Sequence, residues 1–238
     1  MTRPEGRRRG PAAAPTRTTS GRPDLQVYLS EWAALHGGYD PRSNPLVHRW
    51  LSAMFRLAAP LVRLGARPGH VTAAGVLLSG AAVAPAAGGR RWPLVAAGAV
   101  AGAALLDSLD GCVALLSGRV SPFGAVLDNV ADRASDAAML ATLTAAGAPR
   151  GLAAAGVGGL LSLEYVRAAA RGAGFAGIGT VTVGERPTRV AVIVAGLVCA
   201  GLFPRRAAGF AVAAAAAVTG LSLVGQAQLL AVLRSAKR

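Results

Sequence analysis

Acidic side chains gather in one short stretch of a chain that is otherwise weakly charged. Only eleven Asp and Glu residues occur among 238, and five of them are close together, at Asp107, Asp110, Asp128, Asp132 and Asp136. An Asp near the centre of a membrane helix costs about 2.5 to 3.5 kcal/mol, so four without partners would cost on the order of 10 kcal/mol. We therefore expect these carboxylates to have cationic partners and to serve chemistry rather than packing.

The spacing of the acidic residues predicts that they meet. Asp107 and Asp110 are separated by three positions, and Asp128 and Asp132 by four, so on helices each pair occupies one face. A turn near Arg119 would join the two helices as an antiparallel hairpin. The inner pair of carboxylates would then lie about 13 Å from the turn. We expect the four side chains to converge on one cluster.

Converging carboxylates repel one another unless a cation lies between them. Oxygen-only ligand sets favour hard cations, Mg²⁺ first and then Mn²⁺ or Ca²⁺. The three histidines are scattered along the chain and Cys112 stands alone, so nothing indicates a zinc site. The cluster therefore predicts a magnesium site that also accepts manganese.

The elements that would position this cluster are membrane helices. The chain is 53% hydrophobic and only 15% charged, which is too little polar surface for a soluble protein of this size. Residues 69–89 and 207–233 are uncharged and long enough to cross a bilayer. Four further spans are interrupted by charges near one end, at 91–117, 121–147, 150–172 and 187–204. We predict an all-α polytopic membrane protein with six transmembrane helices.

The region before the first span divides into two parts. Residues 1–44 form a basic tail that we predict to be disordered, because the Pro, Gly, Arg and Thr content of its first 23 residues indicates disorder. Residues 45–238 form the membrane domain. That domain opens at 45–66 with arginines spaced by seven among Leu, Trp, Met and Phe, a pattern typical of an amphipathic helix lying in the membrane interface and anchored by Trp50.

Cationic residues predict the orientation. Eleven of the 25 Lys and Arg residues precede the first span, and three more follow the last. Because cytoplasmic flanks collect Lys and Arg, we expect both termini in the cytoplasm and the chain in the cell membrane. The basic tail is better explained by contact with anionic lipid than by a nucleic-acid partner, and no nucleic-acid partner is expected.

Residues 107–132 resemble the signature of the CDP-alcohol phosphatidyltransferases, Asp-x-x-Asp-Gly-x-x-Ala-Arg-x8-Gly-x3-Asp-x3-Asp. Leu115 stands where the signature has Arg. The other elements are present as Asp107, Asp110, Gly111, Ala114, Gly124, Asp128 and Asp132. The family architecture, with six spans after an interfacial helix, is similar to the one predicted here, and the resemblance also implies a homodimer.

The resemblance implies a transfer reaction at the cytoplasmic face of the membrane. A CDP-linked lipid such as CDP-diacylglycerol would donate its phosphatidyl group to the hydroxyl of a small polyol and release CMP, a step of phospholipid biosynthesis. In family terms Asp107, Asp110 and Asp128 would bind a pair of metal ions with help from Asp132. Asp132 would also be the general base, because a carboxylate can take the hydroxyl proton.

The same resemblance implies a nucleotide site beside the metals. Gly111, Ala114 and Gly124 would leave room for the nucleotide against the helices. Arg119, one helical turn after the missing signature Arg, would reach similar space.

Residues 164–189 are similar to a second stretch, found in phosphatidylinositol-phosphate synthases and their archaeal relatives. The matching positions are Tyr165, Arg167, Ala168, Glu185, Arg186, Pro187 and Arg189. In those relatives basic residues hold the phosphate of the acceptor, a role for which guanidinium groups are suited. The residues that we assign to this role are Arg133, Arg167, Arg186 and Arg189. Inositol phosphate, glycerol phosphate and an unphosphorylated polyol all stay open as acceptors.

Three alternatives compete with this interpretation. An intramembrane prenyltransferase also uses Asp-rich motifs and Mg²⁺, but carries them on well-separated helices of a larger bundle. A cation transporter would not need glycine and alanine at signature spacing. A family member with weakened catalysis is the third alternative. Leu115 replaces the Arg of the signature, and Ala169 replaces an Arg of the second stretch.

Overall fold

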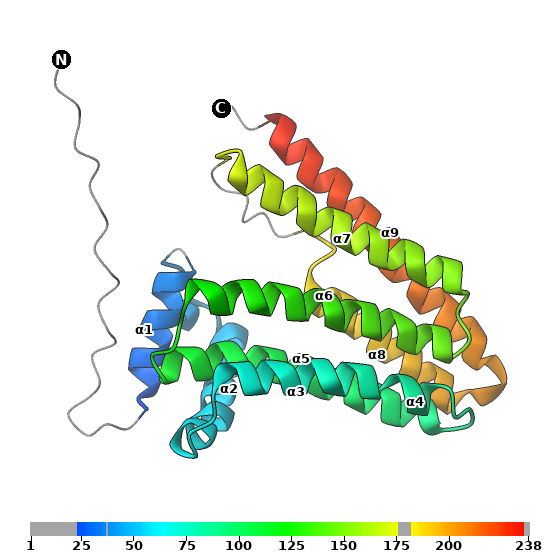
Figure 1. The fold of residues 1–238 in the computed structure, drawn as a ribbon, viewed down its shortest axis with the longest axis horizontal. Helices are drawn as coiled ribbons and strands as arrows, with labels where there is room; N and C mark the ends of the chain where they lie inside the picture. The colour runs from blue at the N-terminus through cyan, green and yellow to red at the C-terminus, as the bar shows by residue number, and fades with distance from the viewer. Residues whose placement is uncertain (1–22, 37, 176–181, 236–238) are drawn as a thin grey trace. The chain divides into compact units, whose positions relative to one another are not determined.

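The computed structural model describes residues 23–36, 38–175 and 182–235, and all regular structure in these ranges is helical (Figure 1). The all-α prediction is therefore confirmed for this part of the chain. The chain forms two compact units, one of residues 1–68 with 111–120 and one of residues 69–110 with 121–238. Each unit is described by itself.

The first unit begins with a short helix inside the tail for which the sequence predicted disorder. Helix α1 spans Leu25–Leu35, and the Asp24 carboxylate caps it by accepting hydrogen bonds of 2.7 and 3.1 Å from backbone N–H groups of the first turn. The Tyr28 ring is buried, with its centroid 5.9 Å from that of Phe55. The predicted disorder is wrong for this helix, because the cap and the buried ring offset the entropy of ordering it. The first 22 residues lie outside the described part.

Helix α2, Pro45–Arg63, occupies the position predicted for the amphipathic helix, and a 3₁₀ turn at Pro41–Ser43 precedes it. One face of α2 is buried, at Leu51, Met54 and Ala58, whereas the three arginines spaced by seven residues are exposed. This separation of faces agrees with an amphipathic helix. Its location at a membrane surface stays a prediction.

The remaining helices follow the predicted spans in order. They are α3 (Pro68–Ala81), α4 (Val83–Ala86), α5 (Trp92–Leu116), α6 (Pro122–Ala145), α7 (Arg150–Gly172), α8 (Arg186–Leu202), a 3₁₀ turn at Pro204–Arg206 and α9 (Ala207–Ser235). Helix α9 packs against both α7 and α8, and Figure 1 shows α7 and α9 running side by side. Pro85 cannot donate a hydrogen bond to the carbonyl four residues earlier, which accounts for the break between α3 and α4.

Three segments of the described chain are long and apolar enough to cross a membrane: Pro68–Ala86, Trp92–Leu116 and Pro204–Ser235. Helices α6 and α7 have 24 and 23 residues, a length of about 35 Å that would also cross a bilayer, but they carry several charges. The prediction of six transmembrane helices therefore stays a prediction.

The turn between α5 and α6 lies where the sequence predicted it. Gly118 has φ +64°, a left-handed conformation that favours glycine and ends α5. Ser121 then caps α6, because its hydroxyl oxygen accepts a hydrogen bond from the N–H of Gly124 at 3.0 Å. Asp107 on α5 and the later acidic residues on α6 are therefore on consecutive helices.

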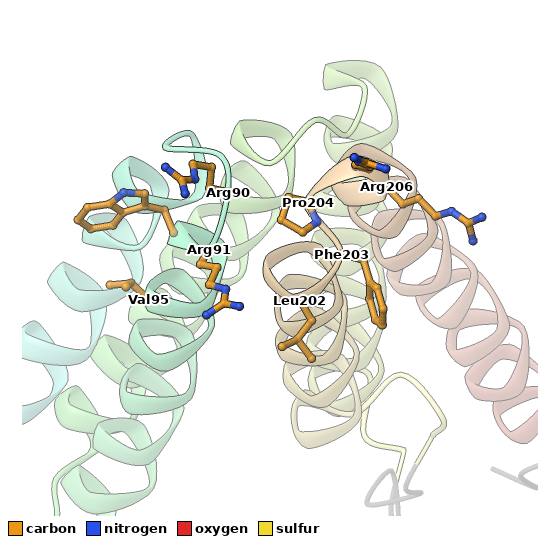
Figure 2. Close-up of a pocket in the computed structure, with 9 residues that line it drawn as sticks. Arg90, Arg91, Val95, Leu202, Phe203, Pro204 and Arg206 are labelled. Atoms are coloured by element: carbon orange, nitrogen blue, oxygen red, sulfur yellow. The ribbon is translucent and has the colours of Figure 1, made fainter.

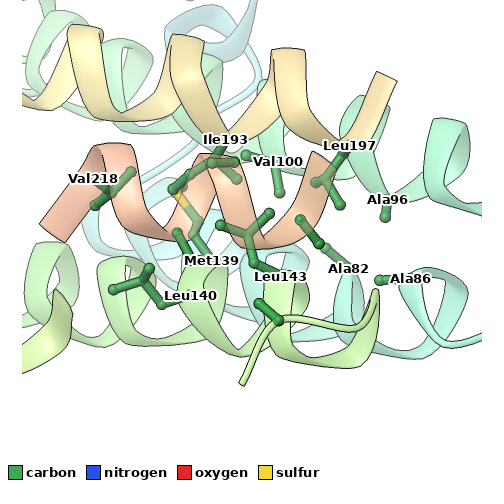
Figure 3. Packing of buried hydrophobic residues seen from close by; sticks show 14 of the residues in the cluster. Ala82, Ala86, Ala96, Val100, Met139, Leu140, Leu143, Ile193, Leu197 and Val218 are labelled. Carbon is green, nitrogen blue, oxygen red and sulfur yellow. The ribbon is translucent and has the colours of Figure 1, made fainter. Parts of the chain in front are cut away.

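The core of the second unit is built from small and branched apolar side chains (Figure 3). It includes Ala96 and Val100 on α5, Met139 and Leu143 on α6 and Ile193 on α8, all of them buried. Small residues let helix backbones approach closely. The acidic residues of α6 and the first arginines of α8 come just before Met139 and Ile193, so the charged groups lie next to this core.

Candidate metal and phosphate site

Three of the four predicted metal ligands come together in the second unit. One carboxylate oxygen from each of Asp107 on α5, and Asp128 and Asp132 on α6, lies within 4.8 Å of the other two. Asp128 is exposed and the other two are half-buried. A hard divalent cation takes oxygen ligands from carboxylates, so this donor set fits Mg²⁺ or Mn²⁺.

Asp110 is not part of this group of three. Its side chain is buried, with 5% of the residue exposed, and its carboxylate accepts a hydrogen bond of 2.6 Å from the hydroxyl of Thr72 on α3. Thr72 could not be identified from the sequence, because it lies 38 positions before Asp110 and no local motif connects them. The predicted role of Asp110 as a metal ligand stays a prediction.

Arg186, the first residue of α8, reaches into the carboxylate cluster. Its Nη1 atom lies 2.9 Å from Oδ1 of Asp107 and also pairs with Oδ1 of Asp132. A guanidinium group therefore joins two of the three clustered carboxylates, which come from different helices. The positive charge offsets part of the repulsion among the carboxylates.

Arg133 connects the cluster to a second group of acidic residues. Its Nη2 atom lies 3.5 Å from Asp132 and 3.4 Å from Asp136, and its Nη1 atom lies 3.4 Å from Glu164 on α7. One fifth of the Arg133 side chain is exposed. Arg133 is thus both a contact of the predicted base, Asp132, and a cation that a ligand can still reach.

Arg189 occupies the deepest position of the network. Its Nη2 atom pairs with Oδ2 of Asp136 at 3.2 Å, and the two side chains are only 2% and 6% exposed. The resemblance assigns Arg189 to the phosphate of the acceptor. The structure places its guanidinium in a buried ion pair between α8 and α6, and its contact with the acceptor phosphate stays a prediction.

Arg167 ties α7 to the segment that leads into α8. Its two terminal nitrogens pair with Glu164 at 3.0 Å and with Glu185 at 2.8 Å. The same Glu185 oxygen accepts hydrogen bonds from the N–H and the hydroxyl of Thr182, at 3.0 and 3.1 Å. These contacts fix the start of α8, and with it the position of Arg186.

Glu185 carries a pH-dependent part of the stability of this segment. Burial alone would raise its pKa, but the hydrogen bonds from Thr182 and the charge of Arg167 outweigh burial and hold the pKa below its ordinary value of 4.5. Because the folded pKa is depressed, the stabilisation is present above about pH 4.5 and is lost as pH falls through the folded pKa. We expect Glu185→Gln to lower the Tm at neutral pH, and this difference from wild type should shrink as pH falls below 4.5. Thermal unfolding in detergent at a series of pH values measures it, and a constant difference would contradict the assignment.

The residues predicted to contact the nucleotide belong partly to the first unit and partly to the second. In the first unit, Gly111 is exposed with open space where a Cβ would lie, Ala114 is half-buried and Arg119 is exposed. In the second unit, Gly124 lies in the first turn of α6, where its N–H meets the Ser121 cap. Nucleotide binding by these residues stays a prediction.

Comparison with known proteins identifies the class to which this fold and site belong. A model of the CDP-alcohol phosphatidyltransferase family matches residues 66–224, more than half of the chain. The chain therefore belongs to the CDP-alcohol phosphatidyltransferase family. Members of this membrane-associated family are transferases of phospholipid biosynthesis, and the chain is an enzyme of that class.

The similar proteins include named synthases of bacteria and archaea. The archaetidylinositol phosphate synthase of Aeropyrum pernix is 41% identical over 93 residues, 38% of this chain and 48% of that protein, so the chain matches about half of its length. The phosphatidylinositol phosphate synthase of Corynebacterium glutamicum is 31% identical over 156 residues, 61% of this chain and 69% of that protein.

A solved structure shares the fold. The phosphatidylinositol phosphate synthase of Mycobacterium tuberculosis, in complex with manganese and citrate, has a TM-score of 0.63 at 27% identity, covering 76% of this chain and 89% of that one. The same protein with CDP-DAG bound has a TM-score of 0.61, covering 76% and 94%. Manganese and CDP-DAG therefore bind to a relative with a similar backbone.

Proposed function

We propose that the chain transfers the phosphatidyl group of CDP-diacylglycerol to the hydroxyl of a phosphorylated polyol, with inositol phosphate as the preferred acceptor, and releases CMP. The observation that carries this proposal is the meeting of three carboxylates from α5 and α6 with the guanidinium groups of Arg133 and Arg186. Acidic ligands for a cation, which would meet the diphosphate of the CDP-lipid, and basic groups for the phosphate of the acceptor therefore lie together in one site.

Asp107, Asp128 and Asp132 are the residues that would hold the divalent cation, with Asp110 as a further predicted ligand. Mg²⁺ or Mn²⁺ bound there supplies positive charge against the diphosphate of the CDP-lipid. The relative crystallised with manganese supports the choice of metal. A second ion, as the resemblance implies, is part of the proposal.

Asp132 is proposed as the general base. A carboxylate oxygen of Asp132 takes the proton of the acceptor hydroxyl while that hydroxyl oxygen forms a bond to the phosphatidyl phosphorus. The bond from this phosphorus to the CMP oxygen breaks, and CMP leaves with the bonding electrons. Arg133 and Arg186 both pair with Asp132, and these ion pairs orient its carboxylate.

Arg133 and Arg186 are also the proposed contacts of the acceptor phosphate. Their side chains are 20% and 15% exposed and lie against Asp132, which takes the hydroxyl proton of the same acceptor. Arg167 and Arg189 are less exposed and act as positioning residues, through Glu185 and Asp136 respectively. The names of the relatives, synthases of inositol-phosphate lipids, favour inositol phosphate over glycerol phosphate.

The membrane topology forms part of the proposal. Six transmembrane helices, both termini in the cytoplasm and a catalytic site at the cytoplasmic face of the cell membrane agree with the distribution of cations. Homodimerisation is proposed from the family resemblance. Within the part of the chain that the structure describes, three of the six spans meet the length and composition of a membrane helix.

Release of CMP by the purified protein tests the proposal. With CDP-diacylglycerol and Mg²⁺ or Mn²⁺ in detergent, we expect release that depends on inositol phosphate and exceeds that with glycerol phosphate, inositol or glycerol. A folded protein that binds metal but releases no CMP with any acceptor would indicate a family member with weakened catalysis. A folded protein that neither releases CMP nor binds metal would contradict the proposed transferase activity.

We expect substitution of a clustered carboxylate to weaken metal binding more than substitution of Asp110 does. We expect Asp128→Asn to weaken Mn²⁺ binding by at least about tenfold, because it removes one of three charged ligands. Asp110→Asn is the matched comparison, and its effect on affinity should be smaller because its carboxylate bonds to Thr72. Electron paramagnetic resonance of Mn²⁺ measures both dissociation constants. A larger effect at Asp110 would mean that the ligand set is centred elsewhere.

Arg186→Gln should change metal and acceptor binding in opposite directions. Removing a positive charge that pairs with Asp107 and Asp132 is expected to tighten Mn²⁺ binding several-fold. The same change removes a donor for the acceptor phosphate, so the KM for inositol phosphate should rise about tenfold or more. Direct metal titration and steady-state kinetics distinguish the two effects. If both affinities change in the same direction, Arg186 does not have these two roles.

A further inference from the structure

A second site lies at the ends of α5 and α8 that are far from the carboxylate cluster. The start of α5 and the end of α8, with the 3₁₀ turn after it, enclose an open pocket of about 1210 Å³ (Figure 2). Arg90, Arg91, Arg205 and Arg206 line it together with aromatic residues. We call this the arginine pocket.

The arginine pocket carries a concentrated positive charge. All four arginines are exposed, and within the described part of the chain none of them forms an ion pair. Arg90 has φ +46°, a left-handed backbone conformation that is uncommon for a residue with a side chain. Four guanidinium groups around one hollow favour an anionic ligand.

The remaining wall of the pocket is apolar and aromatic. Trp92 and Phe203 are each 56% exposed, and Val95 and Leu202 line the same hollow. Figure 2 shows Leu202 and Phe203 on the α8 side and Val95 on the α5 side. Arginines beside apolar residues at the ends of membrane helices form a surface that suits an amphipathic ligand.

Close helix packing holds the two walls of the pocket together. A Cβ added at Gly201, near the end of α8, would come within 2.6 Å of the Leu94 side chain on α5. A Cβ added at Gly88 would come within 2.9 Å of the Trp92 ring. The approach at Gly201 brings α8 against α5 and so joins the two walls, whereas the approach at Gly88 lies within the α5 wall.

The arginine pocket lies at the start of α5 and the end of α8, whereas Asp107 of the carboxylate cluster lies further along α5 and Arg186 lies at the start of α8. Helix α5 rises about 22 Å from Trp92 to Asp107, and α8 rises about 24 Å from Arg186 to Leu202. These lengths approach the thickness of the hydrocarbon core of a bilayer, about 30 Å. On the membrane topology proposed above, the pocket opens at the surface opposite the catalytic one, where the positive-inside bias disfavours arginine.

We propose that the arginine pocket binds an anionic phospholipid of the leaflet opposite the catalytic site. The arginines hold the phosphate of the headgroup, and the upper part of an acyl chain lies against Val95, Leu202 and Phe203. A free phosphate ion would use the guanidinium groups but would leave the apolar wall exposed to solvent. The combination of both surfaces in one hollow therefore favours a lipid.

Fluorescence of Trp92 tests this proposal without changing the pocket. The chain has three tryptophans, and Trp32→Phe with Trp50→Phe leaves Trp92 as the reporter. In nanodiscs, brominated phosphatidylglycerol should occupy the pocket and quench Trp92 at least about tenfold more effectively than brominated phosphatidylcholine. Replacing all four arginines by Gln should abolish the preference, whereas Arg150→Gln, an exposed arginine outside the pocket, should not.

Added salt and added inorganic phosphate provide two further tests of the proposal. If the fourfold variant does not fold, high salt added to the unchanged reporter should remove the preference, because salt screens exposed charges. Millimolar inorganic phosphate should leave the quenching unchanged. Equal quenching by both lipids, a preference that survives loss of the arginines or high salt, or displacement by phosphate would each overturn the proposal. None of these readouts depends on catalysis.

Discussion

Asp132→Asn is expected to reduce acceptor-dependent CMP release by about 10²- to 10⁴-fold, the range over which a general base contributes. The amide cannot accept the proton of the acceptor hydroxyl. It also removes a negative charge from between Arg133 and Arg186, which both pair with the carboxylate. The substitution nearly preserves the volume of the side chain, so the loss should appear in kcat more than in stability. Steady-state assay of CMP measures it.

A matched variant separates this effect from a general response to losing an Asp. Asp40 lies in the first unit, where it pairs with Arg42 at 3.4 Å and is more than half exposed. Asp40→Asn removes the same charge from the surface and should keep near wild-type activity, because exposed ion pairs contribute little. Activity of Asp132→Asn within tenfold of wild type would move the role of general base to another group.

Sequence spacing was sufficient to predict part of the site. Asp128 and Asp132 share one face of α6 because they are four residues apart, and this holds whatever the helix packs against. The turn near Gly118 then limits how Asp107 can approach them. Spacing predicted that four carboxylates converge, and these local relations explain why three of them, Asp107, Asp128 and Asp132, come together.

Relations between distant helices could not be predicted in the same way. The hydrogen bond from Thr72 to Asp110 and the ion pair of Arg186 with Asp107 depend on the rotation and register of one helix against another. Hydrophobicity does not determine that register here, because small apolar residues occur on every face. The burial of Arg189 has the same origin, since its partner lies on a different helix.

The short helix of the first unit could not be predicted from the sequence for a different reason. The tail was predicted from composition, which averages over a window and detects the arginines and prolines before residue 24. The helix Leu25–Leu35 depends instead on a single cap and on the contact of Tyr28 with a later helix. Composition does not contain that contact, so it could not distinguish this segment from the tail before it.

Asp136→Leu is expected to destabilise the second unit by about 3 to 5 kcal/mol, the usual cost of removing one partner from a buried ion pair. Asp136 and Arg189 are 6% and 2% exposed and lie 3.2 Å apart, so the remaining guanidinium would be left buried and without its carboxylate. Arg133 would still pair with Asp132 and Glu164. Thermal unfolding in detergent should show a Tm lower by about 10 °C.

The double variant Asp136→Leu with Arg189→Met should recover much of this stability, because an apolar pair of similar volume often replaces a buried ion pair at little cost. It also decides the role of Arg189, which the family resemblance assigns to the acceptor phosphate. If Arg189 is a positioning residue, a double variant that regains stability should keep a KM for inositol phosphate close to that of wild type. A KM raised about tenfold in a stable double variant would instead mean that Arg189 reaches the phosphate during turnover. Failure to recover stability would mean that the pair is held by polar contacts that leucine and methionine cannot replace.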